Sequence, residues 1–277
     1  MTTLPPADPS RNNFFNQNFP FNVDLISSIE IRQVVSKLKA NKTAGPDKTI
    51  TELFKWLNDD NFEIFTKCLN VFWAEQSVPD SFTQAHACCL HRKGARDNPE
   101  NYRPISLLNS CYKVFAGVIQ VRLASMLENY IGHTQYGFRS KRSTAEPLYC
   151  VHRLTDFAEQ GHDPLFLIFL DWKKAFDRID HEKMFLSLSR LGIPQAIIDN
   201  IKSLYQNPAF KVMQGIHESE WQQQRTGIRQ GCPLSPYLFI LTMHVMFHDV
   251  KEQFNDPRHQ KLFKISTSKN CCMQTTP

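Results

Sequence analysis

The sequence lacks the features that mark secreted, zinc-binding and membrane-spanning proteins. Its 8 cysteines form no C-x-x-C pair and have no zinc-like spacing with the 10 histidines. No apolar run approaches the length of a membrane span, and no charged start followed by an apolar core marks a signal peptide. We therefore expect reduced, mostly buried thiols and an intracellular protein, nuclear or cytoplasmic, without membrane contact.

What the sequence does contain is enough apolar material for a core, together with one basic region. The 277 residues are 42% hydrophobic, which suits one large domain or two ordinary ones. The net charge is +5, yet residues 86–142 alone hold nine Lys and Arg residues against three Asp and Glu residues. Such a stretch is a candidate for contact with phosphates, and a solvated basic face is the alternative.

Periodicity divides the chain into helices and strands. A disordered linker is expected over residues 1–22, and a capping box at Ser27 and Glu30 predicts the start of the first helix. Two short segments around Gly215 are typical of a hairpin. We expect a strand over 83–90, a helix containing Val114, Val118 and Leu123, and helices over 51–76, 145–160, 181–191, 195–205 and 237–250.

The stretch at residues 165–180 is central to the chain. Six apolar residues, 165–170, run directly into Asp171. A run of this length predicts a strand buried on both faces, with a buried helix as the alternative. A carboxylate at the end of a core strand indicates a metal, a cationic partner or an open cleft, although a helix cap or turn residue would give the same pattern.

Five motifs, taken in order, resemble the reverse transcriptase domain of LINE-type (non-LTR) retrotransposons. They are KTAGPD at 42–47, NYRPISLL at 101–108, QYGFR at 135–139 with RST at 142–144, DWKKAFD at 171–177 and RQGCPLSP at 229–236. The resemblance covers roughly residues 25–250. It implies an α/β (α+β) fold of right-hand polymerase type, with helix-rich fingers over 23–164 and a partial palm with an incomplete sheet over 165–250. Residues 251–277 look like an unrelated or disordered tail.

The resemblance also implies a chemistry. RNA-directed DNA polymerases add deoxynucleoside triphosphates to a DNA primer on an RNA template, using two Mg²⁺ ions, or Mn²⁺ in their place, held by carboxylates. Asp171 matches the family's first metal-binding aspartate, so it is the expected catalytic residue and metal ligand. We expect Asp177 to orient the loop and Asp180 to cap the following helix.

Further residues match the family's substrate contacts. The expected nucleotide-binding residues are Arg92, Lys93, Arg103, Phe176, Gln230 and Gly231. Arg92, Lys93 and Arg103 match the family's residues that clamp the triphosphate. Phe176 matches the aromatic that lies under the incoming sugar. Gln230 and Gly231 match the turn that lies along the nucleotide. Arg139, Lys141 and Arg142 are expected near the template. From the residues alone, Phe176 could also be a core residue, and a solvated surface charge would be the favoured interpretation of each basic side chain.

The sequence departs from the family at one motif. A complete domain has, a few tens of residues after Pro236, an aromatic-Ala-Asp-Asp turn that supplies the second metal-binding aspartate. This sequence has no such turn, because Asp59 and Asp60 lie far upstream of Asp171 and Asp249 follows Pro236 too soon. We therefore expect a fragment that does not polymerise alone, which leaves its status as an enzyme open.

Two other functions are compatible with parts of the sequence. A non-catalytic nucleic-acid-binding remnant of a retroelement is the main alternative, because it needs only the basic surface. A metal-dependent nuclease or phosphatase built around Asp171 has little support, because clustered His, Asp or Glu ligands are missing. No feature of the sequence indicates an oligomeric state.

Overall fold

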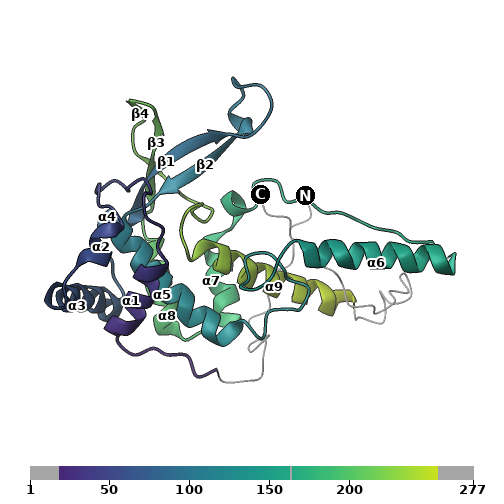
Figure 1. Cartoon of the computed structure of the whole chain (residues 1–277), viewed down its shortest axis with the longest axis horizontal. Coiled ribbons are helices and arrows are strands. Elements are labelled where there is room, and N and C mark those ends of the chain that lie inside the picture. Colours follow the sequence, from purple (N-terminus) through teal and green to yellow (C-terminus); the bar gives the residue numbers. More distant parts are fainter. Residues whose placement is uncertain (1–18, 163, 255–277) are drawn as a thin grey trace.

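Helices are the main elements of the protein (Figure 1). The computed structural model describes residues 19–162 and 164–254. The first helix begins at the predicted capping box, in which the Ser27 hydroxyl accepts from Glu30 N and the Glu30 carboxylate accepts from Ser27 N. The helices are α1 (Ser28–Lys37), α2 (Glu52–Trp56), α3 (Asp59–Glu75), α4 (Asp80–Thr83), α5 (Ser110–Leu127), α6 (Ala145–Gly161), α7 (His181–Arg190), α8 (Gln195–Leu204) and α9 (Ser235–Phe254).

A small mixed sheet lies on one side of the helices (Figure 1). β1 pairs antiparallel with β2 and parallel with β3, which in turn pairs with β4 and β5. The predicted strand over 83–90 and the hairpin around Gly215 are therefore confirmed. Because β1 and β3 are neighbours, the sheet brings the two halves of the chain together. The strands are β1 (Gln84–His91), β2 (Tyr102–Leu107), β3 (Ala209–Gln214), β4 (His217–Glu218) and β5 (Gln222–Gln223).

The helix α5 forms the centre of the core. Val114, Phe115, Ile119 and Leu123 are fully buried, and further buried residues occupy the other sides of the helix. A helix that is apolar all round is typical of one enclosed by other elements, and α5 contacts both α1 and α8. One cluster of buried side chains extends from Phe21 to Val245, so the segments predicted as fingers and palm share a core.

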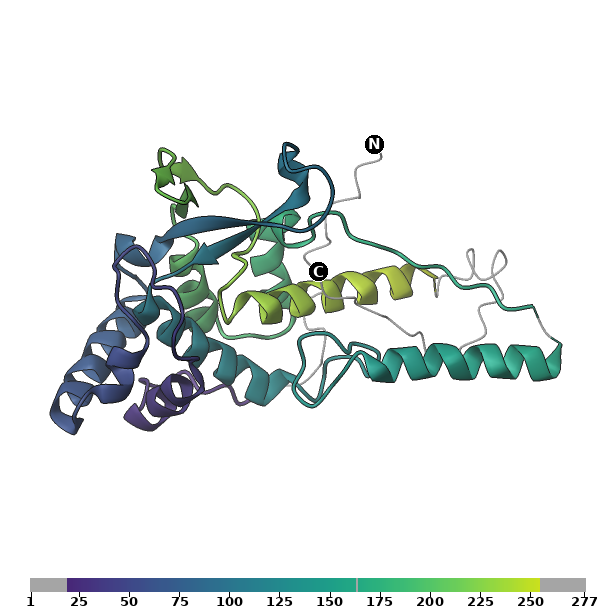
Figure 2. The same ribbon diagram turned by 45° about the horizontal axis from the view of Figure 1, so that its top comes forward.

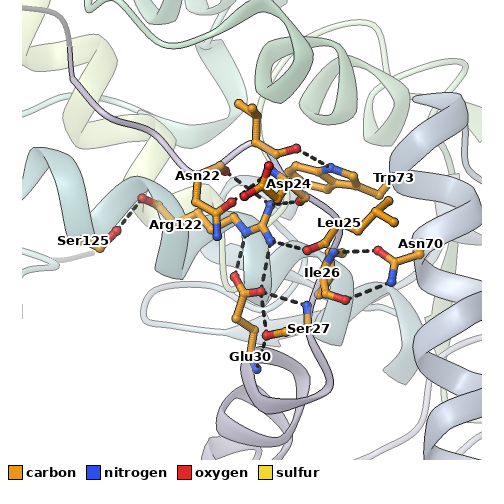
Figure 3. A network of polar contacts seen from close by, with 11 residues as sticks. Asn22, Asp24, Leu25, Ile26, Ser27, Glu30, Asn70, Trp73, Arg122 and Ser125 are labelled. Atoms are coloured by element: carbon orange, nitrogen blue, oxygen red, sulfur yellow. Dashed lines mark hydrogen bonds and ion pairs between the residues drawn. The ribbon is translucent and has the colours of Figure 1, made fainter.

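A buried arginine of α5 fixes the first described residues (Figure 3). The Arg122 side chain is 3% exposed and donates to both Glu30 carboxylate oxygens, at 2.7 and 3.0 Å. It also donates to the carbonyl oxygens of residues 22, 24 and 25, and its guanidinium carbon lies 4.6 Å from the centroid of the Trp73 ring. Phe21 is buried nearby. Residues 19–22 of the predicted linker thus belong to the folded part, while residues 1–18 lie outside the described residues.

The buried strand predicted at residues 165–170 is not formed. The segment is extended, but no described strand pairs with it and all its side chains are exposed. Phe166 is 87% exposed and Ile168 is 85% exposed. A strand needs hydrogen-bonding partners along at least one edge, and the described residues supply none here. The prediction of burial is wrong in this structure because burial of an apolar run depends on neighbours that local sequence does not specify.

α6 and the segment after it form one end of the molecule (Figures 1 and 2). The helix predicted over 145–160 is confirmed, and within it only Pro147 is buried. Tyr149 and Phe157 are 65% and 61% exposed. This end therefore carries apolar side chains that no described element covers.

The last described helix, α9, continues to Phe254, beyond the predicted end of the palm. The rest of the predicted tail, residues 255–277, lies outside the described residues. Among the helices that the structure describes, none is both long enough and apolar enough to cross a membrane.

Candidate nucleotide and nucleic-acid site

The centre of the candidate site is a turn at residues 227–231 that packs against β2. Gly231 has a φ of +120°, and a Cβ atom at this position would lie 2.5 Å from the Ser106 carbonyl oxygen. Ser106 N also donates to the Gln230 carbonyl oxygen at 2.6 Å. Glycine alone combines this conformation with so close an approach. The turn predicted from the sequence therefore lies directly on the strand that carries Arg103.

The side chain of Gln230 lies between Arg103 and Asp177. Its Oε1 accepts from Arg103 Nε at 2.7 Å, and its Nε2 donates to Asp177 Oδ1 at 3.4 Å. All three side chains are partly buried. Two of them are predicted nucleotide-binding residues that lie 127 positions apart in the sequence, so the fold brings them into direct contact.

A second turn, at residues 174–179, packs against the other side of the first. Backbone hydrogen bonds of 2.7 and 2.9 Å join residues 227 and 228 to residues 179 and 176. A Cβ atom on Gly227 would lie 2.8 Å from Asp177 Cα, and His181 Nε2 lies 2.7 Å from the Gly227 carbonyl oxygen. The sequence did not predict this role of His181. The available signal was the position of His181 just after Asp180. The Asp180 carboxylate accepts from Lys183 N and caps α7 as predicted.

The ring of Phe176 lies inside this unit. Phe176 is 8% exposed, and its ring centroid lies 5.8 Å from that of Phe138 and 5.1 Å from that of Phe239. Contact with the sugar of a nucleotide requires an exposed ring edge. The geometry therefore favours the core role that the residue pattern allowed as the alternative, in which Phe176 supports the wall of the site.

The expected metal ligand, Asp171, is exposed at the end of the unpaired segment. Within residues 19–162 and 164–254, no group of three or more His, Cys, Asp or Glu residues could hold a metal ion. The carboxylate of Asp249 accepts two hydrogen bonds from Arg190, at 2.6 and 2.7 Å, and these hold the pKa of Asp249 below its usual value. A two-metal site needs several oxygen ligands at one place, so the described residues do not fit one.

Arg92 and Lys93 lie on the loop that joins β1 to β2. Both are exposed, and Arg92 N donates to the Asn101 carbonyl oxygen at 2.9 Å. The β1–β2 register pairs Leu90 with Arg103. One hairpin therefore carries all three basic residues that were predicted to hold a triphosphate.

Arg139, which was predicted to lie near the template, is engaged within its own loop. Its side chain is 7% exposed, and Nε donates to the Glu128 carboxylate at 2.9 Å. The two terminal nitrogens donate to the carbonyl oxygens of residues 128, 131, 132 and 135. A guanidinium with this many internal partners holds the loop together, and the geometry favours that role over contact with a template.

Lys141 and Arg142 lie at the surface beside that loop. Lys141 is exposed, and the Arg142 side chain is 31% exposed. Arg142 donates to Glu146 at 2.7 Å, and its guanidinium carbon lies 5.8 Å from the centroid of the Tyr136 ring. Cations beside an aromatic ring are typical of surfaces that bind single-stranded nucleic acid.

The sequence did not predict the role of Arg229, which begins the motif at 229–236. Arg229 is 2% exposed and donates to the carbonyl oxygens of Phe82, at 3.1 Å, and Thr83. Its guanidinium carbon lies 5.7 Å from the centroid of the Tyr112 ring. It therefore ties the turn at 227–231 to the end of α4. The only sequence signal was a charged residue beside Ile228 in a tight turn.

Comparison with known proteins agrees with this arrangement of motifs. The family described as reverse transcriptase (RNA-dependent DNA polymerase) matches residues 91–273, which is more than half of the chain. The chain belongs to the reverse transcriptase family. Members of this family bind a nucleic-acid template and deoxynucleoside triphosphates and need divalent metal ions. The matched range also includes residues 251–273 of the expected tail, so it does not support an unrelated origin for that tail. The unrelated origin stays a prediction.

Relatives of this reverse transcriptase domain come from mobile elements. The probable RNA-directed DNA polymerase from transposon BS of Drosophila melanogaster is 28% identical over 255 residues, covering 88% of this chain and 28% of the relative. The RNA-directed DNA polymerase from the mobile element jockey of the same species is 28% identical over 79% of this chain and 25% of the relative. The 149 kDa protein of transposon TX1 of Xenopus laevis is 28% identical over 77% of this chain and 16% of the relative.

These names confirm the predicted kind of reverse transcriptase domain, that of non-LTR retrotransposons. The chain spans between 16% and 28% of the length of these three relatives.

Proposed function

We propose that this domain supplies the nucleotide-binding and template-facing part of an RNA-directed DNA polymerase of a non-LTR retrotransposon, and that the chain does not polymerise alone. The observation that carries the proposal is the junction of β2 with the two turns, where Arg103 contacts Gln230. In the right-hand description of polymerases, residues 23–164 form the fingers and residues 165–250 form a partial palm.

The nucleotide would bind beside this junction. Arg92, Lys93 and Arg103 lie on one hairpin and carry the positive charge that a triphosphate requires. Gln230 contacts Arg103, and Gly231 is exposed on the same turn, which packs against β2.

The metal of the complete enzyme is expected to be Mg²⁺, with Mn²⁺ as a substitute, and it would neutralise charge on the transferring phosphoryl group. Asp171 is the one residue of the described chain that we propose as its ligand. Since the described residues include no cluster of ligands that could hold a metal pair, we assign the bond-forming step to no residue of this chain.

The RNA template and DNA primer are the proposed macromolecular partners. Lys141 and Arg142 are the basic residues of their loop that remain accessible to a phosphate backbone. Arg139 would act indirectly by holding that loop in place.

A second candidate is a non-catalytic nucleic-acid-binding remnant. One observation favours it: the part of the chain that the structure describes keeps accessible basic side chains but has no cluster of metal ligands. The two functions share the template surface and differ only in catalysis.

Filter binding of a single-stranded RNA tests the template surface that both functions require. We expect affinity to fall as salt rises, and Lys141→Ala with Arg142→Ala should lower the slope of log K against log salt by about 0.7 for each phosphate that the variant no longer neutralises. Lys67→Ala, which removes an exposed charge from α3, is the matched control and should leave the slope unchanged. Equal effects of the two changes would count against a template surface at Lys141 and Arg142.

A further inference from the structure

We propose that Asp177 is a positioning residue: its carboxylate fixes the orientation of the Gln230 amide, and this amide in turn holds the Arg103 guanidinium in place for a triphosphate. The inference rests on the function proposed above, because it deepens the account of the same nucleotide site. It concerns a residue that the sequence assigned only to the shape of its loop.

The chemistry of the three side chains allows one arrangement of the amide. A carboxylate only accepts hydrogen bonds and a guanidinium only donates them, whereas an amide has one end of each kind. With Asp177 on one side and Arg103 on the other, the Gln230 NH₂ must face Asp177 and Oε1 must face Arg103. The reversed amide would place two donors together at Arg103 and two acceptors together at Asp177.

The carboxylate of Asp177 can select this orientation because its own backbone is fixed. Asp177 N donates to the Lys174 carbonyl oxygen at 3.1 Å, and the Asp177 carbonyl oxygen accepts from Thr226 Oγ1 at 3.2 Å. The close packing of Gly227 on Asp177 Cα allows little displacement. The carboxylate therefore stands at a set position relative to the turn that carries Gln230.

Loss of this acceptor would leave one end of the amide without its partner. The Gln230 amide could then rotate, and its Oε1 would no longer be held at 2.7 Å from Arg103 Nε. The Arg103 guanidinium would sample more orientations, so a triphosphate would have to order it at the cost of binding affinity.

Equilibrium binding of a fluorescently labelled deoxyadenosine triphosphate to the whole chain tests the nucleotide side of the proposal. We expect Asp177→Ala to weaken binding about fivefold, the size of one hydrogen bond. Asp177→Asn should stay within about twofold of the parent because its amide oxygen can still accept. Glu220→Gln is the control, since it removes one exposed carboxylate charge from the loop between β4 and β5 and should leave binding unchanged.

A double-mutant cycle separates positioning from a general effect on the fold. If Asp177 acts through Gln230, Asp177→Ala should have no further effect on binding in a Gln230→Ala chain. The same fivefold loss in both backgrounds would overturn the proposal, because it would show an effect that bypasses Gln230. Thermal unfolding of each variant checks that the fold is retained.

NMR of the chain with ¹⁵N-labelled arginine gives a readout that does not depend on nucleotide binding. We expect the Arg103 Nε–H signal, assigned by its loss in Arg103→Lys, to shift and exchange faster with water in Asp177→Ala but not in Asp177→Asn. An unchanged signal in Asp177→Ala would overturn the positioning role. If the signal responds as expected while the parent chain binds no nucleotide, the positioning role stands and the proposed nucleotide site fails.

Discussion

At the scale of single residues, three buried arginines connect segments of the described chain through backbone carbonyl oxygens. Arg122, Arg139 and Arg229 each donate to two or more backbone carbonyl oxygens. A guanidinium has five donors in a fixed fork, so one side chain can hold a loop that has no regular structure of its own. The local sequence shows that these residues are basic but not what their guanidinium groups contact.

Replacement of Arg122 should therefore be costly. Arg122→Leu removes the charged partner of the Glu30 carboxylate and the donor to three carbonyl oxygens, and we expect a loss of about 3 kcal/mol in the free energy of unfolding, measured with urea. The control is Arg32→Ala, which breaks an exposed ion pair with Asp59 and should cost about 1 kcal/mol or less. Similar losses for the two variants would contradict the structural role of Arg122.

The same ion pair predicts a pH dependence. Burial raises the pKa of Glu30, but the hydrogen bonds from Arg122 and Ser27 and the charge of Arg122 outweigh burial and hold the pKa below its usual value. The folded pKa is thus below the unfolded one, near 4.3 for a glutamate, so this stabilisation is present above that value and is lost as pH falls through the folded pKa. Urea unfolding between pH 6 and pH 3 should show a smaller acid loss in Glu30→Gln, and an unchanged acid loss would exclude this linkage.

At the scale of elements, the turn at 227–231 depends on glycine for its contact with β2. Gly231→Ala would put a methyl group 2.5 Å from the Ser106 carbonyl oxygen, at a φ of +120°. The turn would therefore have to move away from Ser106. We expect weaker nucleotide binding and a fall of several degrees in melting temperature. Gly215→Ala, at a φ of +62° with no atom within 4 Å, is the matched control for backbone strain without a clash. A Gly231→Ala variant as stable as this control would refute the close approach.

The elements also show what local sequence can predict. The capping box at Ser27, the helix cap at Asp180 and the hairpin around Gly215 were predicted because each depends on neighbours within a few residues. The apolar run at 165–170 has equally clear local chemistry, yet its burial requires a partner strand from elsewhere. The family resemblance assigned Arg103 and Gln230 to one nucleotide site but predicted no contact between them. The links made by Asp177 and Arg229 likewise join segments that no periodicity connects.

At the scale of the whole molecule, one end exposes a large apolar surface. Phe166, Ile168 and Phe169 of the unpaired segment are more than 70% exposed, and Phe157 of α6 adds to them. An extended apolar segment with open backbone groups is an aggregation hazard. Phe166→Ser with Ile168→Ser should raise the monomeric fraction measured by size-exclusion light scattering. The control Ile216→Ser, at an exposed turn remote in sequence, should leave the monomeric fraction unchanged. A parent chain that unfolds cooperatively and reversibly on heating would count against the aggregation hazard.

Primer extension by the purified chain on a homopolymer RNA template, with Mg²⁺ or Mn²⁺, beside an Asp171→Ala variant, tests whether the chain polymerises alone. We expect no extension by either chain, because the described residues include no cluster of ligands that could hold a metal pair, together with salt-sensitive binding of the template. Extension by the parent chain that Asp171→Ala abolishes would contradict it, and would mean that another carboxylate completes the metal site.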